Sequence, residues 1–251
     1  MPSNAVHSNI AGNLARVRER IASACRRVGR APSDVRLVAV TKYVDVEAIR
    51  ALLSAGQFDF GENQVQQLTR RAAALGADLS PLHAPIKSDH APQPRWHLIG
   101  SLQRNKVRAL LPASRLVHSL DSVRLAEEID ARVSAIDATV EALLEVNIAG
   151  EVSKHGVAPD EAAVVLEAIR KLPSLKVRGL MCMAPLNPNP EAARPCFKAL
   201  HDLGIGFQAQ ELLDSSALEL SMGMSQDFEV AIEEGATLVR VGSALFDAPA
   251  P

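Results

Sequence analysis

Short apolar runs alternate with amphipathic, helix-like stretches along almost the whole chain, and this alternation constrains the fold more than any other feature. The runs cover residues 35–42, 58–63, 96–100, 115–121, 140–147, 176–183, 217–224 and 237–246. Repeated strand–helix units of this kind predict a parallel sheet. Eight strands in a chain of about 250 residues are typical of a closed (β/α)8 barrel, the TIM barrel. An open, doubly wound sheet is the alternative.

Two segments fall outside the alternation. Residues 8–30 carry apolar side chains at helical spacing and predict an additional N-terminal helix, for which Gly29 is a plausible end. Only five residues follow Phe246, so we expect no helix after the eighth strand and expect the N-terminal helix to cover that gap. Residues 78–95 contain four prolines and show no period, which indicates a surface insertion within one domain that spans residues 1–251.

Composition excludes several classes of protein. The net charge is −2 with acids and bases intermixed, so the basic stripe of a nucleic-acid-binding or membrane-surface protein is missing. No apolar segment reaches the length of a membrane span, and the N-terminus lacks a signal core. Three cysteines (Cys25, Cys182 and Cys196) show no paired spacing, and the seven histidines add no metal-ligand pattern. We therefore expect a cytoplasmic protein without disulfides or a bound metal.

A lysine stands at the end of the first apolar run, where a barrel would have its active site. The active sites of such barrels lie at the carboxyl ends of the strands. Lys42 follows the run VRLVAVT directly. A lysine at a strand end is commonly a solvated charge, but in a partly desolvated pocket it can form a Schiff base with a carbonyl compound.

The last two predicted strands carry the small and polar residues of a phosphate site. Phosphate in these barrels is commonly bound by the loops after strands seven and eight. The seventh run ends in SMGMS with Ser225, and the eighth contains Gly242 and Ser243. Serine hydroxyls can donate to an anion, and a glycine lets the main chain approach it. Alternatively, Ser225 only caps the following helix, and Gly242–Ser243 is only a turn.

A lysine facing a phosphate site across the barrel mouth suggests a ligand that carries both an aldehyde and a phosphate. Pyridoxal 5′-phosphate (PLP) has both groups. A phosphorylated sugar, bound by a Schiff-base aldolase, is the alternative on the residues alone.

Several blocks of the sequence, in this order, resemble the pyridoxal phosphate homeostasis proteins. The blocks are AVTK, GENQVQQL, WHLIGSLQRNK, SLD, VNIAGEVSKHG, GLMCM, LSMGMSQDFEVAI and VRVGSALF, and they extend from about Val35 to Phe246. The resemblance implies the barrel fold of the N-terminal domain of alanine racemase. It also implies that Lys42 holds PLP as an internal aldimine and that the remaining cofactor-binding residues are Asn63, Met224, Ser225, Arg240, Gly242 and Ser243.

The resemblance places Arg240 opposite the pyridine nitrogen of PLP. A guanidinium does not give up its proton, so it would donate to a neutral ring nitrogen and leave the ring a weak electron sink. A structural role for Arg240, paired with Glu233 or Glu234, is the alternative.

The resemblance favours a PLP-binding protein that serves vitamin B6 homeostasis without robust turnover, with PLP-dependent apo-enzymes as possible partners. The alternative is a racemase-like PLP enzyme. Alanine racemases have a further β domain that supplies a tyrosine base and completes a dimer, so we prefer a monomer here. The only tyrosine, Tyr43, follows Lys42 and would point to the opposite face of a strand.

Three other side chains near strand ends could be acid–base groups. We interpret them instead as an internal hydrogen-bonding histidine (His97), a small core residue (Cys182) and a helix cap (Asp121). The insertion at 78–95, Ser101 in SLQRNK and Tyr43 after AVTK depart from the family pattern, and these departures surround the pocket without touching the residues assigned to PLP. Lys106 and Lys154 are possible minor sites of aldimine formation.

Overall fold

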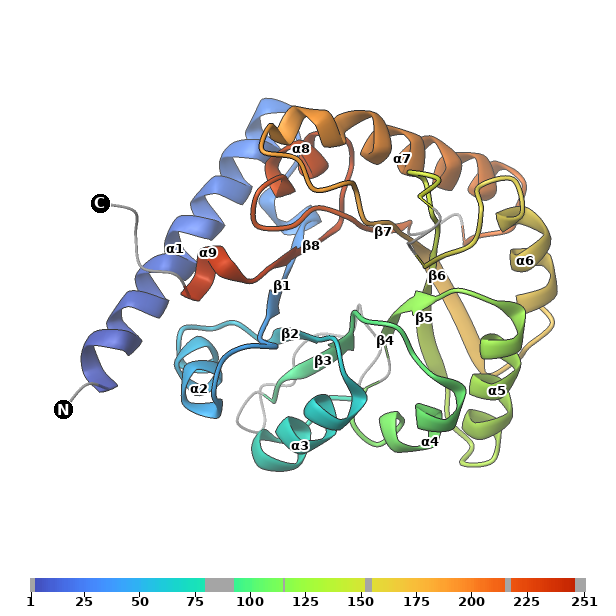
Figure 1. The fold of residues 1–251 in the computed structure, drawn as a ribbon, viewed down its shortest axis with the longest axis horizontal. Helices are drawn as coiled ribbons and strands as arrows, with labels where there is room; N and C mark the ends of the chain where they lie inside the picture. The colour runs from blue at the N-terminus through green and yellow to red at the C-terminus, as the bar shows by residue number, and fades with distance from the viewer. Residues whose placement is uncertain (1–2, 80–92, 115, 152–154, 215–217, 247–251) are drawn as a thin grey trace.

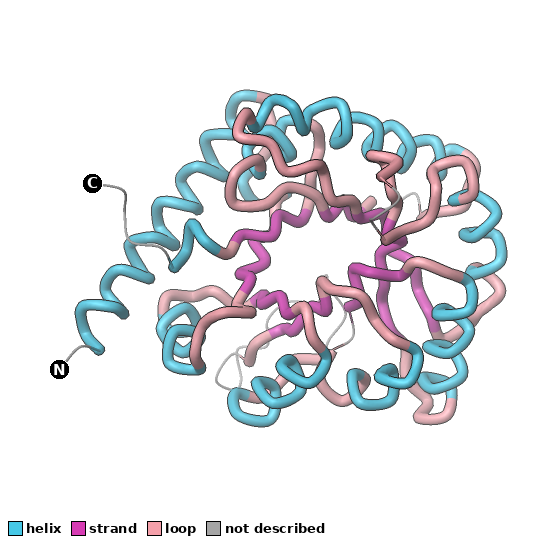
Figure 2. Tube along the Cα trace, in the orientation of Figure 1, coloured by secondary structure: helices cyan, strands magenta, loops and turns pink. Residues whose placement is uncertain are grey.

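Eight parallel strands close into a barrel in chain order, and β8 pairs back onto β1. This computed structural model describes residues 3–79, 93–114, 116–151, 155–214 and 218–246. Figure 2 shows the strands as a central ring surrounded by helices. The predicted (β/α)8 barrel is confirmed, and the open doubly wound sheet is excluded.

The strands are shorter than the apolar runs that predicted them, because each run continues into the loop beyond its strand. They are β1 (Arg36–Val40), β2 (Asp59–Glu62), β3 (Arg95–Leu98), β4 (Leu116–Leu120), β5 (Val140–Glu145), β6 (Leu175–Met181), β7 (Glu219–Ser221) and β8 (Leu238–Val241). Lys42 therefore lies two residues beyond the end of β1.

Helices follow the strands and cover the outside of the barrel (Figure 1). They are α1 (Ser3–Arg27), α2 (Val46–Ser54), α3 (Val65–Leu75), α4 (Val107–Leu110), α5 (Val123–Ser134), α6 (Ala162–Ile169), α7 (Arg194–Ala209), α8 (Phe228–Glu233) and α9 (Ser243–Phe246). Short 3-10 turns are η1 (Pro32–Asp34), η2 (Arg104–Lys106) and η3 (Pro190–Ala193). None of the helices in the described ranges is both long and apolar enough to cross a membrane.

The buried apolar side chains form two clusters. The larger cluster fills the space between the strands and the surrounding helices. The smaller one lies inside the barrel and consists of Val38, Leu116, Leu143, Met181 and Leu238. Since successive side chains of a strand point to opposite faces, the strands of a barrel supply both clusters. The polar residues described below share the barrel interior with the smaller cluster.

The N-terminal helix covers the side of the barrel where β8 meets β1. The prediction put it at residues 8–30, whereas α1 begins at Ser3 and ends at Arg27. Gly29, at φ +68°, stops it as expected, and the Arg30 N–H closes the end by donating to the Cys25 carbonyl at 2.9 Å. Leu14 and neighbouring apolar residues of this helix are buried.

The expectation that no helix follows the eighth strand is wrong, because α9 follows β8. The N-terminal helix α1 packs against this short helix and also against α8 and α2. The Asn13 side chain joins the two helices by donating to the Leu245 carbonyl at 2.9 Å.

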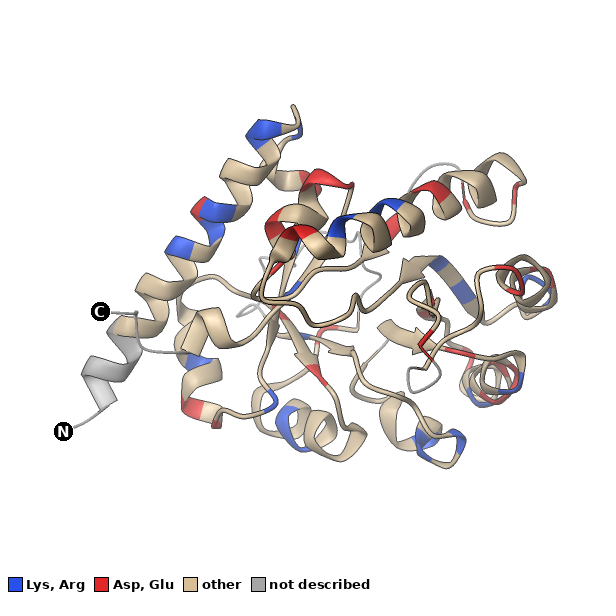
Figure 3. Cartoon of the chain, turned by 45° about the horizontal axis from the view of Figure 1, so that its top comes forward, with Lys and Arg blue, Asp and Glu red and all other residues tan. Residues whose placement is uncertain are grey.

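Ion pairs also attach α1 to the outside of the barrel. Arg20 pairs with Glu229 at 2.9 Å and Arg27 pairs with Glu233 at 2.6 Å. Figure 3 shows basic residues along α1 and acidic residues on the neighbouring α8. Arg194, at the start of α7, pairs with both Glu233 and Glu234 at 2.7 Å.

The ends of the proline-rich segment lie side by side. The Asp78 N–H donates to the Pro94 carbonyl at 2.9 Å, so these two ends are joined by a main-chain hydrogen bond. Residues 80–92 of the predicted insertion lie outside the described residues, as does Lys154. The prediction of one domain over residues 1–251, with this insertion, stays a prediction.

Candidate functional site

A cavity of about 490 Å³ opens at the carboxyl ends of the strands, where sequence reasoning placed the site. All seven predicted cofactor-binding residues line it. The full lining is Val40, Lys42, Tyr43, Val44, Asn63, Ile99, Gly100, Met183, Met224, Ser225, Gln226, Arg240, Gly242, Ser243 and Phe246. The loops after β1, β2, β3, β6, β7 and β8 therefore contribute to one cavity.

Lys42 lies in a tight turn at the rim of this cavity. The turn is closed by the Val44 N–H, which donates to the Thr41 carbonyl at 3.0 Å. The Lys42 side chain is half-buried, and its Nζ lies 4.8 Å from the centre of the Tyr43 ring. Within the described ranges, no carboxylate forms an ion pair with this amine.

The expectation that Tyr43 points away from the pocket is wrong. It assumed that Lys42 and Tyr43 continue the strand, with alternating side chains. Both residues lie in the turn, where alternation does not apply, and Tyr43 is 88% exposed at the cavity rim.

Ser225 joins the loops after β7 and β8 beside the same cavity. Its Oγ accepts a hydrogen bond from the Gly242 N–H at 3.1 Å and a longer one from the Ala244 N–H at 3.5 Å. The alternative that Ser225 caps the following helix is wrong: α8 begins after Asp227. Gly242 and Ser243 are not merely a turn, because α9 begins at Ser243. Two main-chain N–H groups thus converge on one hydroxyl beside the cavity.

The loop that carries Ser225 has a glycine that its shape requires. Gly223 has φ +88°, and an added Cβ would lie 2.5 Å from the Cβ of Ala231 and 2.9 Å from the Cα of Phe228. The buried carboxylate of Asp227 closes the same loop by accepting from the Met224 N–H at 2.6 Å. Burial raises the pKa of this carboxyl above its ordinary value.

Arg240 is only 5% exposed. It donates to the Ser221 Oγ at 2.5 Å and to the Cys182 carbonyl at 3.0 Å. The alternative of an ion pair with Glu233 or Glu234 is wrong, because Arg194 binds those two residues on the outer surface. A guanidinium has five N–H donors, so donors remain for a group in the cavity that Arg240 lines.

A buried chain of hydrogen bonds leads from Arg240 across the barrel interior. Ser221 Oγ lies 2.8 Å from His118 Nδ1, His118 Nε2 lies 2.9 Å from His97 Nδ1, and His97 Nε2 lies 3.1 Å from Asp59 Oδ1. Because β4 and β7 are not neighbours in the barrel, the contact between His118 and Ser221 crosses its interior.

The charges at the two ends set the direction of this chain. Burial alone would raise the pKa of Asp59, but the hydrogen bond from His97 and the charge of Arg95 lower it below the ordinary value. Burial lowers the pKa of His97 and lowers that of His118 further. We therefore assign a carboxylate and two neutral imidazoles, in which every donor points from Arg240 towards Asp59.

The three side chains considered as acid–base groups have the following surroundings. His97 hydrogen-bonds inside the barrel, as predicted. Cys182 is a buried core residue, as predicted; the nearby Cys196 thiol, with Sγ atoms 3.9 Å apart, and burial raise its pKa well above the ordinary value. The prediction that Asp121 caps a helix is wrong: Ser122 caps α5 by accepting from the Leu125 N–H at 3.3 Å.

Sequence reasoning missed Gly100, which fixes the position of Asn63. A Cβ on Gly100 would lie 2.4 Å from the Asn63 carbonyl oxygen and 2.8 Å from its Cα. Only a glycine lets the loop after β3 pass so close to the main chain of Asn63. An isolated glycine after a strand is a known signal for close approach of two backbones, but it does not identify the partner.

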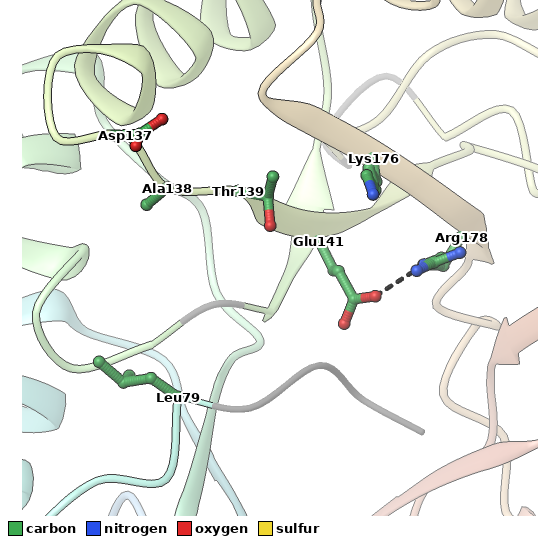
Figure 4. Close-up of a pocket in the computed structure, with 7 residues that line it drawn as sticks. All are labelled: Leu79, Asp137, Ala138, Thr139, Glu141, Lys176 and Arg178. Atoms are coloured by element: carbon green, nitrogen blue, oxygen red, sulfur yellow. Dashed lines mark hydrogen bonds and ion pairs between the residues drawn. The ribbon is translucent and has the colours of Figure 1, made fainter. Parts of the chain in front are cut away.

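A second cavity, of about 400 Å³, lies at the opposite end of the barrel, beside the starts of β5 and β6 (Figure 4). Its charged side chains include Glu141 and Arg178, which pair with each other at 2.7 Å, together with Asp137 and Lys176. None of the predicted site residues lies there. Because conserved chemistry in these barrels is carried by the other end, the cavity around Lys42 is the candidate site.

The groups around the first cavity match the chemistry of one kind of ligand. The amine of Lys42 suits an aldehyde. The Ser225 hydroxyl, which accepts from the Gly242 and Ala244 N–H groups, keeps its own proton to donate to a phosphate. Arg240, which lines the same cavity, supplies donors for a ring nitrogen. In the described part of the chain, no cluster of His, Cys, Asp and Glu side chains could hold a metal ion.

Comparisons with known proteins agree with this arrangement. Residues 12–249 match the family model of the alanine racemase N-terminal domain. The chain is 41% identical over 239 residues to the pyridoxal phosphate homeostasis protein of Aquifex aeolicus. The match covers 95% of this chain and 97% of that protein.

Two solved structures are similar along nearly the whole chain. A structure described as an unknown protein from Bifidobacterium adolescentis has a TM-score of 0.85 and 37% identity, with 97% of this chain and 96% of that chain covered. PipY of Synechococcus elongatus PCC7942, with PLP bound, has a TM-score of 0.77 and 33% identity, with 94% and 99% covered.

Proposed function

Because this chain belongs to the family of the pyridoxal phosphate homeostasis proteins, with the barrel of the alanine racemase N-terminal domain, we propose that it binds PLP in the cavity around Lys42. Its role is then to take part in PLP and vitamin B6 homeostasis. One observation carries the proposal: Lys42 and the phosphate-type group of Ser225, Gly242 and Ser243, far apart in the sequence, line one cavity.

Lys42 holds the ligand covalently in this proposal. Its amine nitrogen adds to the aldehyde carbon, a C=N bond forms and water leaves. The absence of an ion pair on the amine, within the described residues, supports this role, since a carboxylate partner would favour the unreactive ammonium form.

The remaining site residues hold the ligand by its other groups. Ser225, Gly242 and Ser243 bind the phosphate, and Met224 shapes the loop on which Ser225 lies. Asn63 lies beside the ring substituents, on a main chain fixed by Gly100. Arg240 donates to the ring nitrogen while Ser221 and the Cys182 carbonyl hold its guanidinium in place.

The same arginine supports a carrier of PLP rather than a catalyst. PLP chemistry on amino acids needs the ring as an electron sink, which is strongest when the ring nitrogen is protonated. Arg240 cannot supply that proton. Cys182, with its raised pKa, and His97, within the buried chain, are poor second acid–base groups.

Further properties stay predictions. They are a monomeric, cytoplasmic protein that binds no nucleic acid and passes PLP to PLP-dependent apo-enzymes.

A titration of the purified protein with PLP tests the proposal. We expect a yellow absorbance that saturates with PLP, that Lys42→Ala abolishes, and that Lys171→Ala, an exposed lysine on the outer surface, leaves unchanged. A protein that stays colourless in excess PLP would contradict the proposal.

A second measurement separates carrier from catalyst. Exchange of the α-hydrogen of amino acids in deuterated water should be no faster with the PLP-loaded protein than with free PLP. Faster exchange that depends on Lys42 would favour the racemase-like alternative.

A further inference from the structure

The turn that carries Lys42 is held by side chains of α3. Arg71 Nη1 donates to the Thr41 carbonyl at 2.8 Å, and Arg71 Nη2 donates to the Val44 carbonyl. Gln67 Nε2 donates to the carbonyl of Lys42 itself at 3.0 Å. The carbonyls of three residues of the turn are thus bound by two side chains of one helix.

A buried carboxylate fixes Arg71 in turn. Glu62, at the end of β2, is fully buried, and its Oε1 accepts from both Arg71 Nη1 and Thr41 Oγ1. The Arg71 side chain is itself almost fully buried. Because a buried guanidinium needs a partner of opposite charge, Glu62 holds Arg71 against the turn.

Helix geometry aims the two donors at the same place. Gln67 and Arg71 are four residues apart on α3, so they lie on one face of the helix. Their neighbours Gln66 and Arg70 are exposed on another face. These two neighbours are close controls for the two donors.

The main-chain position of Lys42 decides where its amine can reach. Apart from the ring of Tyr43, Nζ has no interaction partner among the described residues, and the side chain has four rotatable bonds. The side chain is thus not held at its tip, whereas its main chain is held on both sides. A shift of the turn would move the whole range that the amine can reach within the cavity.

We propose that Arg71 and Gln67 are positioning residues for Lys42, which hold the turn so that the amine meets the aldehyde of a ligand already bound by its phosphate. Glu62 acts through Arg71. This inference rests on the proposed function, in which Lys42 forms a Schiff base with PLP.

Two ligands separate positioning of the amine from general integrity of the cavity. PLP uses the amine, the ring contacts and the phosphate contacts. The analogue 4′-deoxypyridoxine 5′-phosphate lacks the aldehyde and uses only the last two. Binding of both is measured for the full chain, together with the fraction of bound PLP that absorbs as a Schiff base.

We expect Gln67→Leu to weaken PLP binding about threefold to tenfold, since it removes one hydrogen bond, and Arg71→Gln to weaken it more than about tenfold. Both variants should bind the analogue like the wild type and should show a smaller Schiff-base fraction at saturation. Gln66→Leu and Arg70→Gln should change neither ligand.

Arg71→Lys distinguishes positioning from a purely structural role. It keeps a positive charge beside Glu62 but loses the guanidinium fork that reaches two carbonyls. We expect a small decrease in thermal stability and wild-type analogue binding, with PLP binding still weakened. If Arg71→Gln does not fold, Arg71→Lys and Gln67→Leu decide the matter.

Two results would overturn the inference: PLP binding by Gln67→Leu and Arg71→Lys that equals the wild type, or equal losses for PLP and the analogue. If wild-type protein forms no Schiff base with PLP, the proposed function itself fails, and this inference fails with it.

Discussion

His118 on β4 and Ser221 on β7 come from strands that are not neighbours, and their side chains meet in the barrel interior with Nδ1 and Oγ 2.8 Å apart. This contact is the second of four that connect Arg240, which lines the cavity, with Asp59, at the other end of the barrel. This series of hydrogen bonds holds the Arg240 guanidinium on the side that faces the barrel interior. Breaking it should therefore affect both the stability of the fold and the candidate site.

Replacing His118 by phenylalanine should cut this chain. Ser221 and His97 would each keep a buried polar atom without its partner, and we expect a loss of about 2–5 kcal/mol in the free energy of unfolding. Urea unfolding measures the loss. His201→Gln, on the exposed face of α7, should change it little. A His118→Phe variant as stable as the wild type would show that the chain contributes nothing.

The same two histidines predict that the fold loses stability on acidification below pH 6.5. Their pKa values are lowered in the fold, so below the ordinary value of 6.5 the unfolded chain binds more protons than the folded one. From pH 6.5 to 5.5, each histidine that stays neutral in the fold should cost about 1 kcal/mol. Asp59, with a lowered pKa, loses its contribution only below its ordinary value of 3.8.

His118→Gln isolates one histidine in this measurement. Burial raises the pKa of Glu62 and Glu145, and these groups act in the opposite direction as the pH falls. The variant keeps both carboxyls and removes one titrating imidazole. Urea unfolding at pH 6.5 and 5.5 should show a smaller loss for the variant, and equal losses would contradict the assignment of a neutral His118.

Gly100→Ala should disturb the site through the main chain of Asn63. The new Cβ would meet backbone atoms 2.4 Å and 2.8 Å away, so the loop must shift, and we expect a cost of about 1–3 kcal/mol together with weaker PLP binding. Gly206→Ala is the control, since a Cβ there meets nothing within 4 Å and lies within α7. The control should be neutral or slightly stabilising. Unchanged stability of Gly100→Ala, with unchanged binding, would contradict the close approach.

The sequence predicted the barrel because local pattern and global fold agree along it. The eight apolar runs became β1 to β8 in order, and the polar residues that follow them met at one end. Parallel strands bring their carboxyl ends together whatever the details of the loops, so the order of the apolar runs was enough to place Lys42 and Ser225 at one end of the barrel.

The predictions for single side chains were wrong where a loop interrupts the alternation of a strand. Tyr43 was assigned by strand alternation, although the strand ends at Val40 and a turn follows. The pairing of Arg240 with Ser221 could not be predicted, since it depends on which residues share the barrel interior. The hydrogen bonds of Arg71 and Gln67 to the Lys42 turn were missed for a similar reason. The sequence predicts which residues share a face of a helix, but not which loop that face contacts.

Reduction of the PLP-loaded protein with borohydride tests the central claim most directly. Hydride reduces the C=N bond of a Schiff base to a stable amine, so the lysine that held PLP keeps the mass of the reduced pyridoxyl phosphate group. We expect peptide mass spectrometry to find this group on Lys42, and only in trace amounts on Lys106 or Lys154. Stoichiometric labelling of another lysine, or no labelling of Lys42 at saturating PLP, would contradict the account.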